Sequence, residues 1–171
     1  MTRTDSATTD RARAVAETVT DPELPMLTLA DLGVLREVSE VDGRVVVSIT
    51  PTYTGCPAMD TMRDDLVHAL ETAGYRGVEV RTVLHPAWSS DWISEDGRGK
   101  LTEAGIAPPG PAPRRTPGPV PLTLVPPAPR GACPHCGSTD TETVSEFGAT
   151  ACRALRRCRA CGEPFEQVKE I

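Results

Sequence analysis

Four of the six cysteines form two C-x-x-C pairs towards the end of the chain. The first pair is Cys133 and Cys136, the second is Cys158 and Cys161, and 21 residues separate the pairs. A glycine follows each pair directly, which lets the chain wrap around an ion. Because two thiolates at this spacing can bind one ion and four complete a tetrahedron, the pattern predicts a metal site with four cysteine ligands.

The residues between the two pairs favour a zinc ribbon. Two β-like stretches, 141–147 and 150–157, are hinged at Gly148. A module of this size buries too little surface to fold alone, so the metal would supply most of its stability. We expect zinc rather than iron, although a tetrahedral set of four sulfurs suits both metals.

Other side chains of this module could also take part in chemistry. Cys152 could be a spare ligand, a redox contact or a buried structural thiol, and the last interpretation is preferred. His135 lies inside the first pair, and we expect it to be exposed and only a reserve ligand. Nucleic-acid binding is a minor interpretation because the module is nearly neutral, although four arginines make a local basic strip: Arg153, Arg156, Arg157 and Arg159.

Cys56 lies between a β-branched run and a helical pattern. Residues 45–50 predict a buried strand, and residues 57–72 predict a helix with Pro57 as its first residue. Cys56 would then stand at the N-cap or beside it, where unpaired backbone N–H groups and the helix dipole favour a thiolate. Such a thiol is a nucleophile or a metal ligand. The alternative is a small buried hydrophobic residue at a strand–helix corner.

Three titratable side chains are candidates to act beside Cys56. Asp21 and Glu23 lie in a loop bounded by prolines, where the alternative is a helix stop with solvated acids. His85 follows the strand predicted at 78–84, and by itself such a histidine is more often structural than a ligand. The strand–helix–strand connection predicts a parallel crossover, so Cys56 and His85 would share the carboxyl edge of the sheet.

An α+β domain must hold these residues. We expect a small three-stranded mixed sheet packed with helices, followed by a small all-β zinc ribbon. Asp42 and Gly43 predict a tight hairpin turn between the first two strands. The expected elements are helix 11–19 with Asp10 as N-cap, strands 34–41, 44–50 and 78–84, helix 57–72, and helix 94–104 with Ser94 as N-cap.

Composition divides the 171-residue chain. Most of the 17 prolines lie in 107–130, which predicts a semi-extended linker between a domain at 1–106 and a ribbon domain at 131–171. The net charge of −6 is concentrated in residues 1–106, which argues against general affinity for nucleic acid. No apolar run reaches the ~20 residues of a membrane span and no secretory signal is visible, so we expect a cytoplasmic protein. In that compartment the six cysteines indicate metal or reactive thiols before disulfides.

Residues 12–107 resemble the MIP18 (DUF59) family of iron–sulfur assembly factors. The motifs that carry this resemblance are D-P-E-L at 21–24, L-G-V at 32–34, T-x-x-x-C-P at 52–57, and W-I-S-E-x-G-R at 92–98 leading to G-I-A-P-P at 105–109. The ribbon adds S-E-F-G-x-T-x-C at 145–152. A MIP18 domain with this ribbon is similar to the PaaD (PaaJ) family.

The resemblance implies an accessory, non-catalytic role in the phenylacetyl-CoA epoxidase system of aerobic phenylacetate catabolism. The partners it implies are the reductase and di-iron oxygenase subunits and iron–sulfur carrier proteins. It implies no association with a membrane. In the wider family the cysteine of the T-x-x-x-C-P motif, here Cys56, is the reactive residue, and the D-P-E loop lies close to it. The expected cofactors are therefore a structural zinc in the ribbon and a transient iron–sulfur cluster or iron at Cys56.

Three other classes of function stay open. The chain could be a structural or electron-transfer subunit of the oxygenase, with redox iron in the ribbon. It could be a thiol enzyme with Cys56 as nucleophile and His85 as base, although no oxyanion-hole motif supports this. It could bind nucleic acid through the basic strip.

Overall fold

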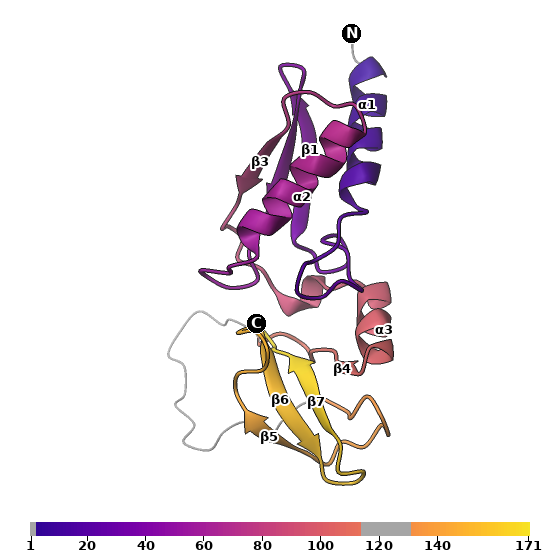
Figure 1. Cartoon of the computed structure of the whole chain (residues 1–171), viewed down its shortest axis with the longest axis vertical. Coiled ribbons are helices and arrows are strands. Elements are labelled where there is room, and N and C mark those ends of the chain that lie inside the picture. Colours follow the sequence, from indigo (N-terminus) through magenta and orange to yellow (C-terminus); the bar gives the residue numbers. More distant parts are fainter. Residues whose placement is uncertain (1–2, 114–130) are drawn as a thin grey trace. The chain divides into compact units, whose positions relative to one another are not determined.

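The computed structural model describes residues 3–113 and 131–171, and the chain divides into two compact units. The first unit comprises Met1–Trp88 and Trp92–Lys100, and the second comprises Ser89–Asp91 and Leu101–Ile171. Figure 1 shows the elements of both units, coloured in the order of the sequence.

A three-stranded sheet frames the first unit. β1 (Leu35–Val41) pairs antiparallel with β2 (Arg44–Ile49), and β3 (Glu79–Thr82) pairs parallel with β2. Asp42 and Gly43 have φ angles of 51° and 75°, the left-handed conformation that a tight type I′ hairpin turn requires. The predicted mixed sheet, its hairpin and its parallel crossover are confirmed.

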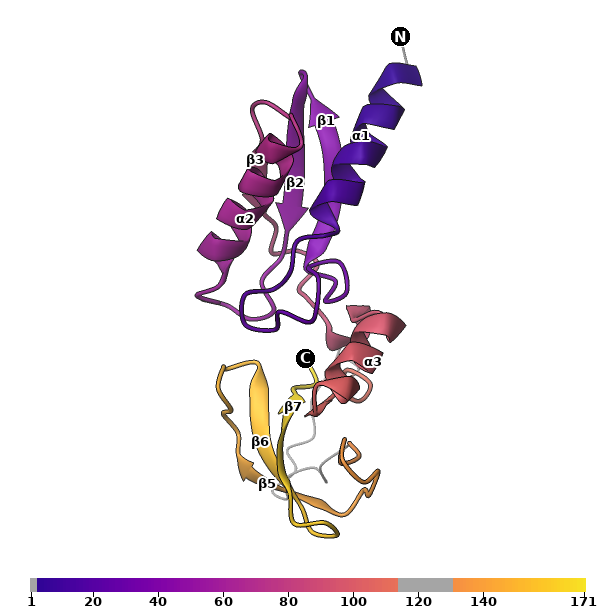
Figure 2. The same ribbon diagram turned by 45° about the vertical axis from the view of Figure 1, so that its right-hand side comes forward.

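Two helices pack on this sheet and on each other. α1 (Arg3–Ala16) lies along β1, and α2 (Met59–Thr72) lies along β3, as Figures 1 and 2 show. α2 buries Met62, Leu66 and Leu70, which recur every four residues and so lie on one helix face. In the central strand β2, residues 45–47 are all buried, because neighbouring strands and helices leave little of it facing water.

Both helices begin at positions other than those predicted. α1 begins at Arg3 rather than Arg11, with Asp10 inside it, because residues 3–10 contain no proline or glycine to interrupt a helix. Val19 lies beyond the end of α1, and its carbonyl accepts a hydrogen bond from Leu29 N at 2.9 Å. α2 begins at Met59, so Pro57 is outside the helix, and the N-cap residue Ala58 has no side chain that could cap it.

α3 (Glu95–Glu103) is fixed at its start by two side chains. The hydroxyl of Ser94 accepts a hydrogen bond from Gly97 N at 2.9 Å, which confirms Ser94 as the N-cap. Asp31 accepts a bond from Lys100 Nζ at 2.7 Å and a second from Thr28 N at 3.0 Å. Asp31 therefore joins α3 to the loop that follows α1.

The second unit contains a four-stranded sheet in the order β4-β7-β6-β5. β5 (Thr141–Ser145), β6 (Arg153–Cys158) and β7 (Pro164–Val168) form an antiparallel meander. The two predicted ribbon strands are confirmed in shorter form, and β7 is an addition that the sequence interpretation missed. Ile171, three residues after β7, accepts a hydrogen bond at 2.9 Å from the backbone N–H of Ser90, the first residue of the short 3-10 helix η1 (Ser90–Trp92).

β4 (Ile106–Ala107) shows that the start of the proline-rich segment belongs to the ribbon sheet. It pairs in parallel with β7, with Ile106 opposite Glu166 and Ala107 opposite Gln167. The boundary expected at 106/107 therefore falls inside the ribbon sheet. Residues 108–113 and 131–171 belong to the same unit, and of the linker predicted at 107–130, residues 114–130 lie outside the described residues. No helix within 3–113 and 131–171 is both long and apolar enough to cross a bilayer.

Candidate functional site

Cys56 lies in a compact loop between β2 and α2. Gly55 has a φ of 83°, and Cys56 N donates a hydrogen bond to Tyr53 O at 3.3 Å. Met59 N in turn donates to Cys56 O at 3.4 Å. Cys56 thus precedes the helix by two turn residues and is not the N-cap, which corrects the predicted geometry. Its side chain is 9% exposed, so most of the thiol is covered by the loop and the core.

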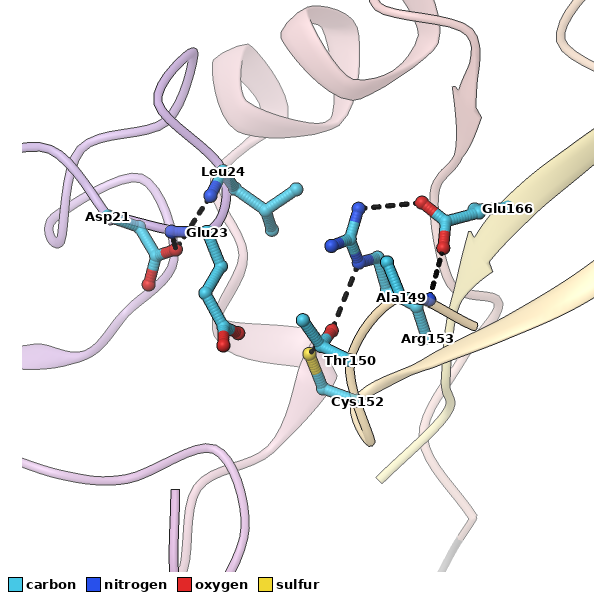
Figure 3. Close-up of polar contacts among 8 residues, drawn as sticks. All are labelled: Asp21, Glu23, Leu24, Ala149, Thr150, Cys152, Arg153 and Glu166. Atoms are coloured by element: carbon cyan, nitrogen blue, oxygen red, sulfur yellow. Dashed lines mark hydrogen bonds and ion pairs between the residues drawn. The ribbon is translucent and has the colours of Figure 1, made fainter. Parts of the chain in front are cut away.

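The D-P-E loop is built around the carboxylate of Asp21. Its Oδ1 accepts hydrogen bonds from Glu23 N and Leu24 N, both at 2.8 Å, as Figure 3 shows. Asp21 is buried and Glu23 is half-buried. A carboxylate that accepts hydrogen bonds from two backbone N–H groups fixes a turn. Asp21 therefore stabilises the conformation of this loop. The Glu23 side chain then remains as the carboxylate candidate of this loop.

Backbone hydrogen bonds bring the two loops to the same end of the sheet. Leu29 O accepts a bond from Val34 N, and Val34 O accepts one from Thr50 N at 3.0 Å, directly before the Cys56 loop. Figures 1 and 2 both show the loop after α1 and the loop before α2 at this end of the first unit. His85 follows β3 at the same carboxyl edge, as the parallel pairing requires, and its side chain is exposed.

The two C-x-x-C pairs adopt the same backbone turn. In the first, Gly137 N donates to Cys133 O at 2.8 Å, and in the second, Gly162 N donates to Cys158 O at 2.9 Å. Both glycines have a positive φ, 74° and 81°, which explains why glycine follows each pair. The chain therefore presents two similar pairs of sulfurs to a common centre.

The four sulfurs of Cys133, Cys136, Cys158 and Cys161 lie within 4.8 Å of one another. The Sγ atoms of Cys133 and Cys161 are 3.8 Å apart, and those of Cys136 and Cys158 are 3.6 Å apart. A tetrahedron with zinc–sulfur bonds of about 2.3 Å has edges of about 3.8 Å. The predicted four-cysteine group thus has the size and donor set that fit a structural zinc ion.

The protonation of these thiols shows why the group needs a cation. The backbone N–H of Cys161 is the main cause that lowers the pKa of the Cys158 thiol to about 7. The backbone N–H of Glu163 also favours a Cys161 thiolate, but lost hydration and the neighbouring sulfurs outweigh it and raise the pKa of Cys161 to about 12. Four thiolates cannot be charged together at this distance unless a metal ion neutralises them.

The remaining candidates of this unit lie outside the four-sulfur group. Cys152 is half-exposed, with its Sγ 3.1 Å from Thr150 Oγ1, and His135 is exposed. Most arginines of the basic strip bind other side chains of the same unit. Arg153 is buried and pairs with Glu166 at 2.7 Å, a contact drawn in Figure 3, and Arg159 pairs with Glu142 at 3.0 Å.

Sequence reasoning missed the residues that surround the metal group. Ala107 and Phe165 form a buried cluster with Cys133 and Cys158. Arg156, assigned to the local basic strip, is buried, with 4% of its surface exposed. A signal for Arg156 was present, because it stands two residues before Cys158 in a strand and strand alternation puts both on one face.

Comparisons with known proteins match both halves of the chain. The family described as "Iron-sulfur cluster assembly protein" matches residues 9–83, and the "PaaD zinc beta ribbon domain" matches residues 118–169. A protein of Escherichia coli (strain K12), described as the D subunit of a "Putative 1,2-phenylacetyl-CoA epoxidase", is 42% identical over 158 residues. These cover 92% of this chain and 90% of that protein.

Two further relatives match about half of the chain. A "Fe-S protein maturation auxiliary factor" of Porphyromonas gingivalis is 37% identical over 86 residues, covering 49% of this chain and 81% of that protein. The crystal structure of a DUF59 domain of unknown function from Bacillus anthracis superposes with a TM-score of 0.54 at 28% identity. That match covers 57% of this chain and 94% of the other.

The fold and the four-cysteine site define an accessory protein of the iron–sulfur assembly class that carries a zinc ribbon. The match to the Escherichia coli epoxidase protein extends over both units and almost the full length of each protein. The chain belongs to the PaaD family.

Proposed function

We propose that this protein helps to mature the iron–sulfur or di-iron centres of a phenylacetyl-CoA epoxidase and takes no part in its turnover. In this proposal Cys56 is the thiol that receives or passes on the cluster or iron, and the ribbon is a zinc-stabilised recognition module. The partners are the reductase and di-iron oxygenase subunits and an iron–sulfur carrier in the cytoplasm. The similarity to the Escherichia coli epoxidase protein over 92% of the chain, together with the assembly-type first unit, carries the proposal.

The surroundings of Cys56 support a transfer role over permanent binding. Among the described residues, the four ribbon cysteines form the one group of three or more clustered ligands, so Cys56 has no ready-made set around it. An iron–sulfur cluster normally takes four ligands, so one thiol cannot hold it alone. A partner must complete the coordination, and the cluster then stays transferable.

The neighbours of Cys56 suggest how the loop would act. The Asp21-built turn and the Cys56 loop lie at one end of the sheet, with His85 at the same carboxyl edge. We assign Asp21 to loop shape, Glu23 to contact with the incoming iron or client, and His85 to the rim of the docking surface. A carboxylate and an imidazole are both able to bind iron during transfer.

The proposal is tested by the cluster content of the reductase in cells. Chains with Cys56→Ser or Cys152→Ser are expressed with the epoxidase subunits, and iron and acid-labile sulfide are measured per flavin of the purified reductase. Cys152→Ser is the matched control, since it removes a thiol outside the metal group. We expect low cluster content only with Cys56→Ser, while zinc per chain is unchanged in both variants. Full cluster loading and an active epoxidase with Cys56→Ser would contradict the proposal.

A further inference from the structure

The second unit buries an arginine that forms no ion pair with a carboxylate of the described residues. Arg156 lies on β6, and its Nη2 donates to Thr141 Oγ1 at 2.7 Å while its Nη1 donates to Gln167 Oε1. Both acceptors are neutral and buried, and Arg156 Nε has no hydrogen-bond partner within 3–113 and 131–171. Glu146 and Glu170 attract the guanidinium from a distance, but neither forms an ion pair with it in the described part of the chain.

A neighbouring arginine shows how unusual this is. Arg153 is also buried on β6, and its guanidinium pairs with the carboxylate of Glu166 at 2.7 Å. A buried charge without a counter-charge is costly because it loses its hydration. Among the described residues no carboxylate lies in direct contact with Arg156, so a closer negative group would stabilise its buried charge.

Strand geometry places that negative group beside Arg156. In β6 the residues Ala154, Arg156 and Cys158 are all buried and share one face, whereas Arg157 is exposed. Residues two apart on one face of a strand are about 7 Å apart. Thr141, which accepts the bond from Arg156, pairs directly with Cys158 across the strands. The guanidinium thus lies on the same buried face of the sheet as the metal ligand Cys158.

We propose that Arg156 is the internal counter-ion of the zinc site and sets its affinity for zinc. A zinc ion bound by four thiolates carries two net negative charges, and its positive neighbour offsets one of them inside the unit. Thr141 and Gln167 hold the guanidinium in place without neutralising it. Arg156 is accordingly a positioning and charge-balancing residue that is not itself a ligand.

The test changes charge while keeping shape. Gln167→Glu retains the side-chain size and the acceptor for Arg156 but supplies a carboxylate that competes for its charge. Arg157→Gln changes the net charge of the chain by the same amount at an exposed neighbouring position, so it is the matched control. The zinc dissociation constant of the full chain is measured by competition with a chelator of known affinity.

We expect Gln167→Glu to weaken zinc binding roughly 10- to 100-fold, the usual effect of residues that support metal ligands. Arg157→Gln should leave the constant within a few-fold of the parent chain. If Arg156 served only in packing and hydrogen bonding, Gln167→Glu would strengthen its bond to Arg156, and zinc binding would be unchanged or tighter. That result overturns the proposal.

A second pair of variants decides the case if Gln167→Glu does not fold. Arg156→Lys keeps the charge but loses the two-pronged hydrogen bond, and Arg156→Met keeps apolar bulk without charge. The proposal requires zinc affinity to follow the charge, with Arg156→Lys close to the parent and Arg156→Met weaker by the factor given above. Equal losses in the two variants contradict it.

Discussion

Ala107 pairs in parallel with Gln167, so the first residue of the proline-rich segment forms part of the edge of the sheet that carries the metal ligands. Ala107 is fully buried and packs with Cys133, Cys158 and Phe165. The ribbon sheet consequently combines β4, at 106–107, with the strands β5 to β7, at 141–168. Metal binding and the pairing of β4 should be coupled, because both depend on the same buried cluster.

This coupling predicts the outcome of removing zinc. Chelation, or Cys158→Ser, should abolish hydrogen-exchange protection of the backbone N–H groups in β4 as well as in β5 to β7, since metal supplies most of the folding free energy of such a module. Protection of β2 in the first unit should persist and serves as the internal control. If β4 stays protected after β6 and β7 have lost protection, the coupling does not exist.

The two phenylalanines of the ribbon should behave in opposite ways. Phe165 is 4% exposed beside the ligands, whereas Phe147 is 68% exposed. Phe165→Ala should cost roughly 3–5 kcal/mol, which would appear as zinc binding weaker by at least about 100-fold where binding and folding are linked. Phe147→Ala should change the zinc affinity little. Equal effects measured by chelator competition would mean that Phe165 does not support the site.

Asp31 should give the first unit a pH-dependent stability. Burial alone would raise the pKa of its carboxyl, but the bonds from Lys100 and Thr28 outweigh this and hold the pKa below its ordinary value. The carboxylate therefore stabilises the folded unit above the ordinary pKa of about 4, and this contribution is lost as the pH falls through the lower folded value.

We expect Asp31→Asn to lower the free energy of unfolding of the first unit by about 1 kcal/mol at neutral pH. The difference should shrink towards about pH 3. Urea unfolding followed by tryptophan fluorescence measures this unit alone, because Trp88 and Trp92, the two tryptophans, both belong to it. A difference that stays constant with pH would show that the charge of Asp31 is not the cause.

Two glycines with positive φ allow strain and crowding to be separated. Gly33 and Gly55 have φ angles of 68° and 83°. A Cβ at Gly33 would lie 2.6 Å from Trp92 Cβ, whereas a Cβ at Gly55 would meet nothing within 4 Å. Gly55→Ala should cost about 1–2 kcal/mol for the left-handed backbone, and Gly33→Ala distinctly more. Equal costs in the same fluorescence assay would contradict the close approach of Trp92.

Local signals were sufficient for the parts of the fold that depend on adjacent residues. Asp42 and Gly43 predicted the hairpin because only certain residues accept its backbone angles, and the glycines after each C-x-x-C pair predicted the metal turns. The four-cysteine group could be predicted in full, since ligand type and spacing alone define it.

Features that depend on distant residues could not be predicted in this way. β4 is two residues long and carries no periodicity, so only its pairing with β7 reveals it. Because of the turn at Cys56, α2 begins at Met59 and not at Pro57, although proline suits the first position of a helix. Arg156 was assigned to a basic strip because it stands in a run of arginines, whereas its burial follows from its place on the buried face of β6.

Cluster transfer to the apo-reductase tests the central claim most directly. An iron–sulfur donor is mixed anaerobically with apo-reductase and the zinc-loaded chain, and the [2Fe–2S] absorbance of the reductase is followed over time. The account predicts that the parent chain and Cys152→Ser accelerate cluster acquisition and that Cys56→Ser does not. Equal acceleration by Cys56→Ser would show that this thiol has no part in maturation.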